Sequence, residues 1–203
     1  MENIEISTEK IILEAARKIF IRKGMEGARM QEIADEAGIN KALLHYYFRS
    51  KEKLFEAIFQ DAILKIVPGI MEMFRSDLPL FEKIEIFTGK YIDTFAENPF
   101  LPGFILNELT RDPQKIINLV SRAGLDPQIF ISQINLEVEL GNIHPVEPYH
   151  LVVNILAMCI FPFMASPILI NILFDRSQET FSQFIQQRKT EVPQFIINSI
   201  RKK

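Results

Sequence analysis

The sequence contains one cysteine, no tryptophan and no excess of positive charge, since its 203 residues carry a net charge of −3. A single cysteine excludes a disulfide within the chain, which is typical of proteins in a reducing cytoplasm. A protein that coats nucleic acid is usually basic overall, so the acidic balance confines any nucleic-acid contact to a local region. The first ten residues, MENIEISTEK, lack the basic start and apolar run of a secretion signal, and we expect a cytoplasmic protein.

No group of residues has the spacing of a catalytic or metal-binding site. The three histidines, His45, His144 and His150, are not spaced as metal ligands, and Cys159 with a distant histidine is not a catalytic dyad. The sequence also lacks a phosphate-binding loop and a dinucleotide glycine motif. We therefore predict that the chain is not an enzyme and uses no metal or cofactor. Cys159 lies in an apolar run and is expected to be a buried structural thiol.

Apolar residues recur every three or four positions along most of the chain, which predicts an all-α fold of about nine to ten helices. The first helix should start at Ser7 or Thr8 and stop at Gly24, and the fourth should start after Ser50 and be bent or ended by Pro68-Gly69. The other helices are expected at about residues 30–37, 40–48, 80–97, 100–110, 113–122, 127–140, 147–174 and 177–202. The fourth helix should join an N-terminal domain, residues 1–50, to a C-terminal domain, residues 51–203.

Residues 24–54, GMEGARMQEIADEAGINKALLHYYFRSKEKL, contain the clearest functional pattern. A short helix ends at Gly38, which is expected in the left-handed conformation that glycine adopts without a Cβ clash. A second short helix follows, with Asn40 as its N-cap. Between Gly38 and Lys53, four lysines and arginines stand against the single acid Glu52, a local charge of +3. The pattern predicts a helix-turn-helix that places its second helix in the DNA major groove, and the alternative is a solvated helix pair without a ligand.

The side chains of the second helix suit different parts of a DNA duplex. Lys41 can reach a guanine edge or a phosphate, and His45 can donate to a phosphate or to a base acceptor. The hydroxyls of Tyr46 and Tyr47 can bond phosphates, while their rings can touch thymine methyl groups. Lys51 and the first amides of the next helix are expected to form an anion site. The predicted DNA-binding set is Arg29, Met30, Asn40, Lys41, Leu43, His45, Tyr46, Tyr47 and Lys51.

The same region resembles the tetracycline-repressor (TetR) family of bacterial regulators over about residues 8–58, without a gap. The resemblance is carried by Ile33-Ala34, Glu36-Ala37-Gly38-Ile39-Asn40-Lys41, Leu44-His45-Tyr46-Tyr47-Phe48 and Ser50-Lys51-Glu52-Lys53-Leu54. It implies an N-terminal three-helix DNA-binding domain, a variable helical domain for ligand binding and dimerisation, and a homodimer on a near-palindromic operator of double-stranded DNA. In this family the usual role is repression with ligand-triggered release.

Several positions depart from the family pattern. His45 stands where the family usually has a tyrosine that bonds phosphate, so this contact is expected to change or to depend on pH. Arg29 stands where a threonine or serine often caps the second helix, so a cap is lost and a cation is gained. Ala42 and Leu43 replace the usual glycine and threonine, and Leu43 could contact a thymine methyl group or simply pack. The base preference therefore cannot be copied from a relative.

The C-terminal two-thirds of the chain is rich in phenylalanine, and most of these rings are expected in the core. A hollow centre lined by the remaining rings would bind an apolar or flat aromatic molecule. Charged residues are sparse in the central helices, which argues against a highly charged ligand. The predicted ligand-binding residues are Phe87, Tyr91, Phe104, Phe130, Ile134, Met158 and Phe161. An alternative is a helical adaptor that uses this pocket for a partner helix.

The segment from Leu151 to Phe174 has no charged side chain and is long enough to span a bilayer. Asn154, Asn171 and two prolines argue against insertion, as does the absence of tryptophan, so we predict no membrane contact. The family resemblance implies that this penultimate helix and the last one, about residues 147–174 and 177–202, form the homodimer interface as a four-helix bundle. The alternative is a membrane-associated helical protein that keeps a helix-turn-helix.

Overall fold

The computed structural model describes residues 7–202, which form eleven α-helices and no β-strand within that range. The helices are α1 (Thr8–Gly27), α2 (Met30–Glu36), α3 (Lys41–Tyr47), α4 (Lys51–Arg75), α5 (Leu80–Glu97), α6 (Leu101–Arg111), α7 (Pro113–Arg122), α8 (Gln128–Glu139), α9 (Pro148–Met164), α10 (Ser166–Ile172) and α11 (Gln178–Ile200). The predicted all-α class is confirmed, with one helix more than the expected nine to ten.

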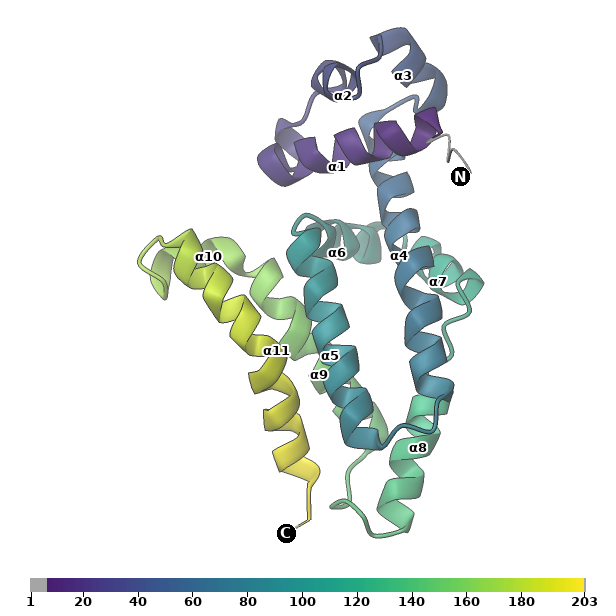
Figure 1. The fold of residues 1–203 in the computed structure, drawn as a ribbon, viewed down its shortest axis with the longest axis vertical. Coiled ribbons are helices and arrows are strands. Elements are labelled where there is room, and N and C mark those ends of the chain that lie inside the picture. The colour runs from purple at the N-terminus through teal and green to yellow at the C-terminus, as the bar shows by residue number, and fades with distance from the viewer. Residues whose placement is uncertain (1–6, 203) are drawn as a thin grey trace, which may run out of the picture.

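The helices form two parts that share α4 (Figure 1). The first part, here called the helix-turn-helix unit, consists of α1, α2 and α3 and lies at one end of the molecule. The second part, here called the C-terminal domain, contains α5 to α11, and within it α5 packs against both α9 and α11. From its contact with α1, α4 runs down into the C-terminal domain, where it contacts α5, α7 and α8.

Side-chain caps fix the starts of the helices that the sequence marks most clearly. Ser7, Asn40 and Ser50 accept hydrogen bonds from the backbone N–H three residues ahead, at 3.4, 2.8 and 3.3 Å respectively. These three predicted caps are confirmed. The start of α2 differs, because Arg29 occupies its N-cap position and makes no capping hydrogen bond. The expected loss of that cap is therefore also confirmed.

Two glycines set the geometry of the helix-turn-helix unit. Gly38 has φ +67°, the predicted left-handed conformation, and the next N–H, that of Ile39, bonds the carbonyl of Ala34 at 3.0 Å. Gly24 has φ +65° and interrupts α1, which resumes for one short turn and ends at Gly27. The predicted stop at Gly24 is therefore a break inside the helix.

Pro68-Gly69 does not end α4, because the helix continues through both residues to Arg75, and the bend expected as the alternative stays a prediction. A proline inside a helix removes one backbone hydrogen bond, here the one to the carbonyl of Leu64. Pro68 and Leu64 are both exposed, so water can hydrate that carbonyl. The loss is tolerated because it falls on the outer side of the helix.

The single helix expected at residues 147–174 is also wrong, because the segment folds as α9 and α10, which are bent by 68°. Pro167 lies in the first turn of α10, where its ring and its missing N–H prevent α9 from continuing. Within residues 7–202, no individual helix has the length and apolar character needed to cross a bilayer, and only this bent pair passes by length and composition.

One continuous hydrophobic core runs through both parts of the molecule. In the helix-turn-helix unit it contains Ile12, Phe20, Ile33 and Leu44, each at most 1% exposed. The Phe20 ring lies 4.9 Å, centroid to centroid, from the ring of Phe55 on α4. The helix-turn-helix unit is therefore held on α4 by buried apolar contacts, and its position follows the position of that helix.

Candidate nucleic-acid interface and internal cavity

The short helix α3 presents most of its side chains to solvent. Its buried residue, Leu44, is 0% exposed and holds the helix in the core. The exposed surface carries Lys41, Leu43, His45, Tyr46 and Tyr47. Tyr46 is 81% exposed, and its ring meets the Tyr47 ring edge-on at 5.5 Å, so the two form one aromatic surface. Five of the predicted DNA-binding residues are thus exposed on α3.

Three more predicted residues lie at helix starts. Asn40 uses its Oδ1 atom to cap α3, which leaves the side-chain NH2 group for an external acceptor. Arg29 precedes α2 and is exposed. Met30, the first residue of α2, is half-buried and packs against the core, so its side chain contributes to packing as well as to the predicted surface.

Lys51, the ninth predicted residue, has a structural role that its sequence position did not reveal. Its Nζ atom donates to the backbone carbonyls of Glu26 and Ala28, at 3.4 and 3.3 Å. These bonds tie the start of α4 to the connection between α1 and α2. These two bonds use two of the three N–H groups of the Lys51 ammonium, which leaves one for an anion. The anion site expected at Lys51 stays a prediction.

Two of the three acidic residues of α2, Glu32 and Glu36, are paired with cations of α1, whereas Asp35 accepts a hydrogen bond from Gln31. Glu36 pairs with Arg22 at 2.8 Å and with Lys18 at 3.4 Å, and Glu32 pairs with Lys23 at 2.7 Å. The hydrogen bond from Arg22, followed by that from Lys18, holds the pKa of Glu36 below its usual range, and the bond from Lys23 does the same for the pKa of Glu32. These carboxylates are therefore occupied and do not neutralise the α3 surface.

Three cations of the helix-turn-helix region have no carboxylate partner within the part of the chain that the structure describes. They are Arg29, Lys41 and Arg49. Cations and hydroxyls on one exposed surface are the groups that contact the phosphate backbone of DNA, while a helix of this size fits the major groove. The geometry of the candidate interface is that of a helix-turn-helix whose second helix is free to enter a duplex.

An apolar cavity of about 280 Å³ lies inside the C-terminal domain, and six helices, α4 to α9, contribute to its wall. Among the described residues that line it, only Tyr91 and Thr94 carry a side-chain polar group. The Thr94 hydroxyl donates to the carbonyl of Lys90 at 2.8 Å. Burial raises the pKa of Tyr91, so its phenol stays neutral. The cavity therefore offers a ligand apolar surface, the uncharged Tyr91 hydroxyl and the Thr94 hydroxyl oxygen as an acceptor only.

Three of the seven predicted ligand-binding residues line this cavity, namely Phe87, Tyr91 and Phe130. The structure places the other four elsewhere. Ile134 is fully buried in the core, Phe104 packs its ring on Phe55 and Phe59, and Phe161 is 59% exposed. Met158 lies in a shallow groove beside Phe161 and Arg188. Helical periodicity identified apolar side chains but not which of them surround empty space.

Sequence reasoning missed the α4, α6, α7 and α9 walls of the cavity, since the predicted residues that line it lie only on α5 and α8. The α4 wall includes Phe59, Ile63, Ile66 and Ile70, which recur at helical spacing and are not among the predicted ligand-binding residues. The α7 wall includes Ile116 and Val120. The cavity therefore borders the helix that carries the helix-turn-helix unit.

A set of large apolar side chains is uncovered on α9, on α11 and on or next to α10. Its members, each at least 59% exposed, are Val153, Phe161, Ile168, Ile172, Leu173 and Phe195. Large apolar side chains that lie together on a surface and are exposed in this way are typical of an interaction surface. They belong to the two segments that the sequence predicts as the dimer interface.

Comparison with known proteins places this geometry in a family. Residues 12–58 match the family model described as "Bacterial regulatory proteins, tetR family". The HTH-type transcriptional regulator RutR of Escherichia coli K12 is 30% identical over 160 residues, which cover 73% of this chain and 70% of RutR. The HTH-type transcriptional activator FasR of Mycolicibacterium smegmatis is 37% identical over 106 residues, which cover 51% of this chain and 48% of FasR.

Solved structures agree with the fold over nearly the whole chain. A transcriptional regulator of the TetR/AcrR family from Thermobifida fusca has a TM-score of 0.66 at 18% identity, covering 96% of this chain and 98% of its own. HlyIIR, a hemolysin II transcriptional regulator, has a TM-score of 0.60 at 22% identity, covering 97% and 98%.

The chain belongs to the TetR family. It is accordingly a DNA-binding transcriptional regulator with an N-terminal helix-turn-helix, and it is not an enzyme. The resemblance stated from the sequence, the predicted function class and the predicted lack of enzymatic activity are confirmed by this membership.

Proposed function

We propose that the protein is a repressor in the cytoplasm that binds a near-palindromic operator as a homodimer and is released by an uncharged apolar or aromatic small molecule. The observation that carries the proposal is the position of the apolar cavity, which lies against α4, the helix on which the helix-turn-helix unit is mounted. A molecule that enters the cavity acts directly on the support of the DNA-reading helix.

The DNA contacts follow from the exposed surface of α3. Two copies of α3 would enter successive major grooves, about 34–36 Å apart on the duplex. Lys41 would contact a guanine edge or a phosphate, His45 and the hydroxyls of Tyr46 and Tyr47 would contact phosphates or bases, and Leu43 a thymine methyl group. Arg29, Met30, Asn40 and Lys51 would complete the contact region from the starts of α2, α3 and α4.

The dimer would form through α9 and α11, with two helices from each protomer packed as a four-helix bundle. The uncovered apolar side chains of these helices support this arrangement, since pairing them removes apolar surface from water. α10, which is bent away from α9, would lie at the edge of that bundle.

The effector class follows from the cavity wall. An unpaired charge buried in an apolar cavity is strongly disfavoured, so the effector should be neutral. The volume of about 280 Å³ suits a small molecule, and the six surrounding helices leave less room for a partner helix, which favours an effector over the adaptor alternative. The Tyr91 hydroxyl would select ligands with one hydrogen-bonding group.

Operator binding is tested with DNA selected from a random pool by the wild-type protein. Lys41→Ala should weaken binding to the selected sequence about tenfold in a gel-shift titration at fixed salt. Lys90→Ala is the matched control, because it removes one exposed lysine on α5, a helix of the C-terminal domain. Tyr47→Phe should also weaken binding while the dimer stays intact. Equal affinity for wild type and Lys41→Ala would overturn the major-groove assignment.

The cavity is tested with N-phenyl-1-naphthylamine, a neutral apolar dye that fluoresces when it is buried. Ala62→Phe places a ring inside the cavity, whereas Ala96→Phe places one on the exposed side of α5. The dye should bind wild type and Ala96→Phe but not Ala62→Phe, with circular dichroism confirming that both variants fold. Equal binding to Ala62→Phe would show that the dye, and by inference the effector, sits elsewhere.

A further inference from the structure

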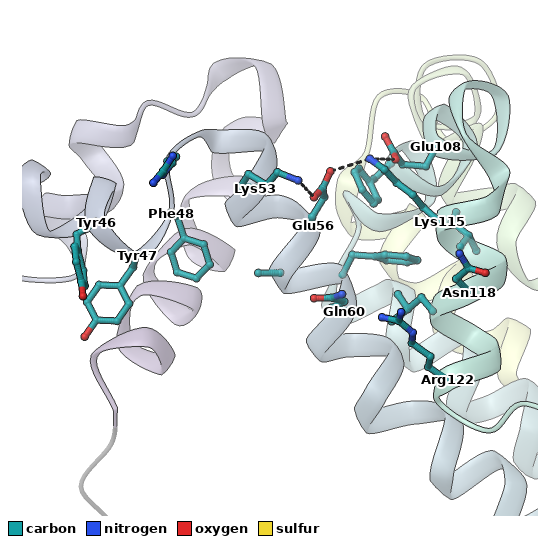
Figure 2. A pocket seen from close by; sticks show the side chains of 16 residues that line it. Tyr46, Tyr47, Phe48, Lys53, Glu56, Gln60, Glu108, Lys115, Asn118 and Arg122 are labelled. Atoms are coloured by element: carbon teal, nitrogen blue, oxygen red, sulfur yellow. Dashed lines mark hydrogen bonds and ion pairs between the residues drawn. The ribbon is translucent and has the colours of Figure 1, made fainter.

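A groove of about 660 Å³ lies between the helix-turn-helix unit and α7 (Figure 2), and it shares the lining residues Phe59 and Ile116 with the apolar cavity. Here called the junction groove, it is lined by charged side chains from both parts of the molecule. These are Arg49, Lys53, Glu56, Glu108, Lys115 and Arg122. In Figure 2, Lys53 and Glu56 project from α4 on one wall, and Lys115 reaches toward them from α7 on the other.

Lys115 joins three helices through one ammonium group. Its Nζ atom donates to Glu56 Oε1 of α4 at 3.1 Å and lies 3.4 Å from Glu108 Oε2 of α6. The other oxygen of Glu56 accepts from Lys53 at 2.8 Å, but Lys53 is on the same helix and links nothing across the groove. Lys115 is therefore the cation that connects α4 to α6 and α7 at this point.

Glu108 makes the position of Lys115 hard to change. This glutamate is 4% exposed, and its Oε2 atom has no hydrogen-bond donor. Arg111, the other nearby cation, lies 4.0 Å from the opposite oxygen. A buried carboxylate without a cation beside it destabilises the folded protein, so the Lys115 ammonium is expected to stay next to Glu108. This holds the same ammonium group at the distance from which it donates to Glu56.

The helix that carries Lys115 also forms part of the cavity wall. Val120 faces the apolar cavity, Asn118 faces the junction groove, and Ile116 contributes to both. A molecule that displaces α7 from inside the cavity must also displace Lys115 relative to Glu56. Cavity and helix-turn-helix unit are thus connected by a charged contact, in addition to the apolar packing along α4.

We propose that Lys115 is a positioning residue that sets the orientation of the helix-turn-helix unit by tying Glu56 on α4 to α7 and to buried Glu108, and that effector binding acts on the operator through this tie. The proposal rests on the proposed function. With the tie intact, the two helix-turn-helix units of a dimer keep one separation and accept one half-site spacing. Without it, the separation varies, and operators of different spacing are bound more equally.

The first test measures the separation directly, without DNA or effector. A spin label at Glu14→Cys reports on α1, because Glu14 is exposed and the native Cys159 is 1% exposed and stays unlabelled. The distribution of distances between the two labels of a dimer should be broader in the Glu56→Ala variant than in the labelled protein without that substitution. Lys53→Ala, which removes the partner within α4, should leave the width unchanged. Equal widths in Glu56→Ala and Lys53→Ala would overturn the proposal.

The second test measures spacing selectivity on the selected operator and on a version with one base pair inserted between its half-sites. The Glu56→Ala variant should bind the original operator about two- to fivefold more weakly, which is the effect expected for the loss of one partly exposed ion pair. Its preference for the original operator over the lengthened operator should also decrease. Lys115→Met should do the same, and the double variant should add little. An unchanged preference in both single variants would overturn the proposal.

The two tests also separate this proposal from the proposed function. If the wild-type protein selects no DNA, the proposed function fails, while the label distances still decide whether Lys115 positions the helix-turn-helix unit. If DNA is selected and Glu56→Ala behaves as wild type in both tests, the proposed function stands and the role of Lys115 is wrong. The Glu56→Ala variant keeps the Lys115–Glu108 pair, so the buried carboxylate of Glu108 still has its cation. The result for this variant therefore does not depend on whether the protein folds with an unpaired buried charge.

Discussion

The Phe55 ring on α4 lies 4.7 Å from the Phe104 ring on α6, measured between centroids. The Phe104 ring also lies 5.2 Å from Phe59, one turn further along α4. Since Phe55 contacts Phe20 of α1 as well, a row of rings passes from the helix-turn-helix unit into the C-terminal domain. Sequence periodicity had suggested Phe104 for the effector site, but its packing makes it part of the joint between the two parts.

Phe104→Ala should lower the free energy of unfolding by about 3–5 kcal/mol, because it removes a ring that is 9% exposed and leaves a cavity. Phe104→Leu, which fills much of the same space, should lose clearly less. Urea denaturation followed by circular dichroism measures both values. A loss below about 1 kcal/mol for Phe104→Ala would contradict the packing role, since that is the scale of an ordinary surface substitution.

Gly38→Ala and Gly103→Ala should have opposite effects on stability. Gly38 has φ +67°, a conformation that costs an alanine about 1–2 kcal/mol, although nothing lies within 4 Å of the added Cβ atom. Gly103 lies in α6 with the same open surroundings and without a positive φ, so alanine there should stabilise by up to about 1 kcal/mol. Thermal unfolding of both variants gives the sign, and destabilisation by Gly103→Ala would be the contrary result.

The thiol of Cys159 should resist alkylation in the folded protein. Burial raises the pKa of Cys159 to about 12, a change that the nearby Arg188 charge only partly opposes. Because the thiolate is the reactive form, iodoacetamide at pH 8 should modify the native protein far more slowly than the unfolded protein. Mass spectrometry after timed quenching measures the two rates. Equal rates would mean that the region around α9 opens readily.

The carboxyl group of Glu56 should titrate below the ordinary glutamate value of 4.5. Burial raises the pKa of Glu56, but the hydrogen bonds from Lys53 and Lys115 outweigh it, so the net shift is downward. A lowered folded-state pKa gives stability that is present above the unfolded pKa and lost as the pH falls through the folded one. Carbon-13 NMR of the Glu56 carboxyl group should show this pKa rising in Lys115→Met, and an unchanged value would contradict the ion pair.

The boundaries of several helices could be predicted because proline and capping residues mark them. The predicted helices at 80–97 and 113–122 agree with α5 (Leu80–Glu97) and α7 (Pro113–Arg122). α7 begins at its own proline, whose fixed φ suits a first helical position. At such positions the local backbone chemistry decides the structure, and the packing of the rest of the chain has little influence.

Proline alone did not predict where helices end. Pro68 is tolerated inside α4 and Pro162 inside α9, whereas α9 gives way to α10 just before Pro167. Whether a proline ends a helix depends on two things. One is whether water reaches the carbonyl that loses its hydrogen bond, and the other is how neighbouring helices pack against the segment. Neither can be read from the sequence. The charge-free run from Leu151 to Phe174 therefore looked like one helix.

The cavity was the least predictable feature. Phe87 lines it and Ile134 does not, yet both are large apolar residues at helical spacing in the C-terminal domain. The difference arises from how six helices cross, which leaves space beside one side chain and none beside the other. The exposed residues of α3 were easier to predict, because an exposed aromatic or cationic side chain on a short capped helix stands out from the sequence.

The length of α4 determines how small a movement at the cavity is sufficient to displace α3. About sixteen residues separate Val67, at the cavity, from Lys51, the first residue of α4 after the helix-turn-helix unit, and a helix rises about 1.5 Å per residue. Over that span, of about 24 Å, a rotation of about 5° moves the far end by about 2 Å. Successive base pairs are about 3.4 Å apart, so a tilt too small to disturb the packing around the bound molecule is enough to misalign α3 with its bases.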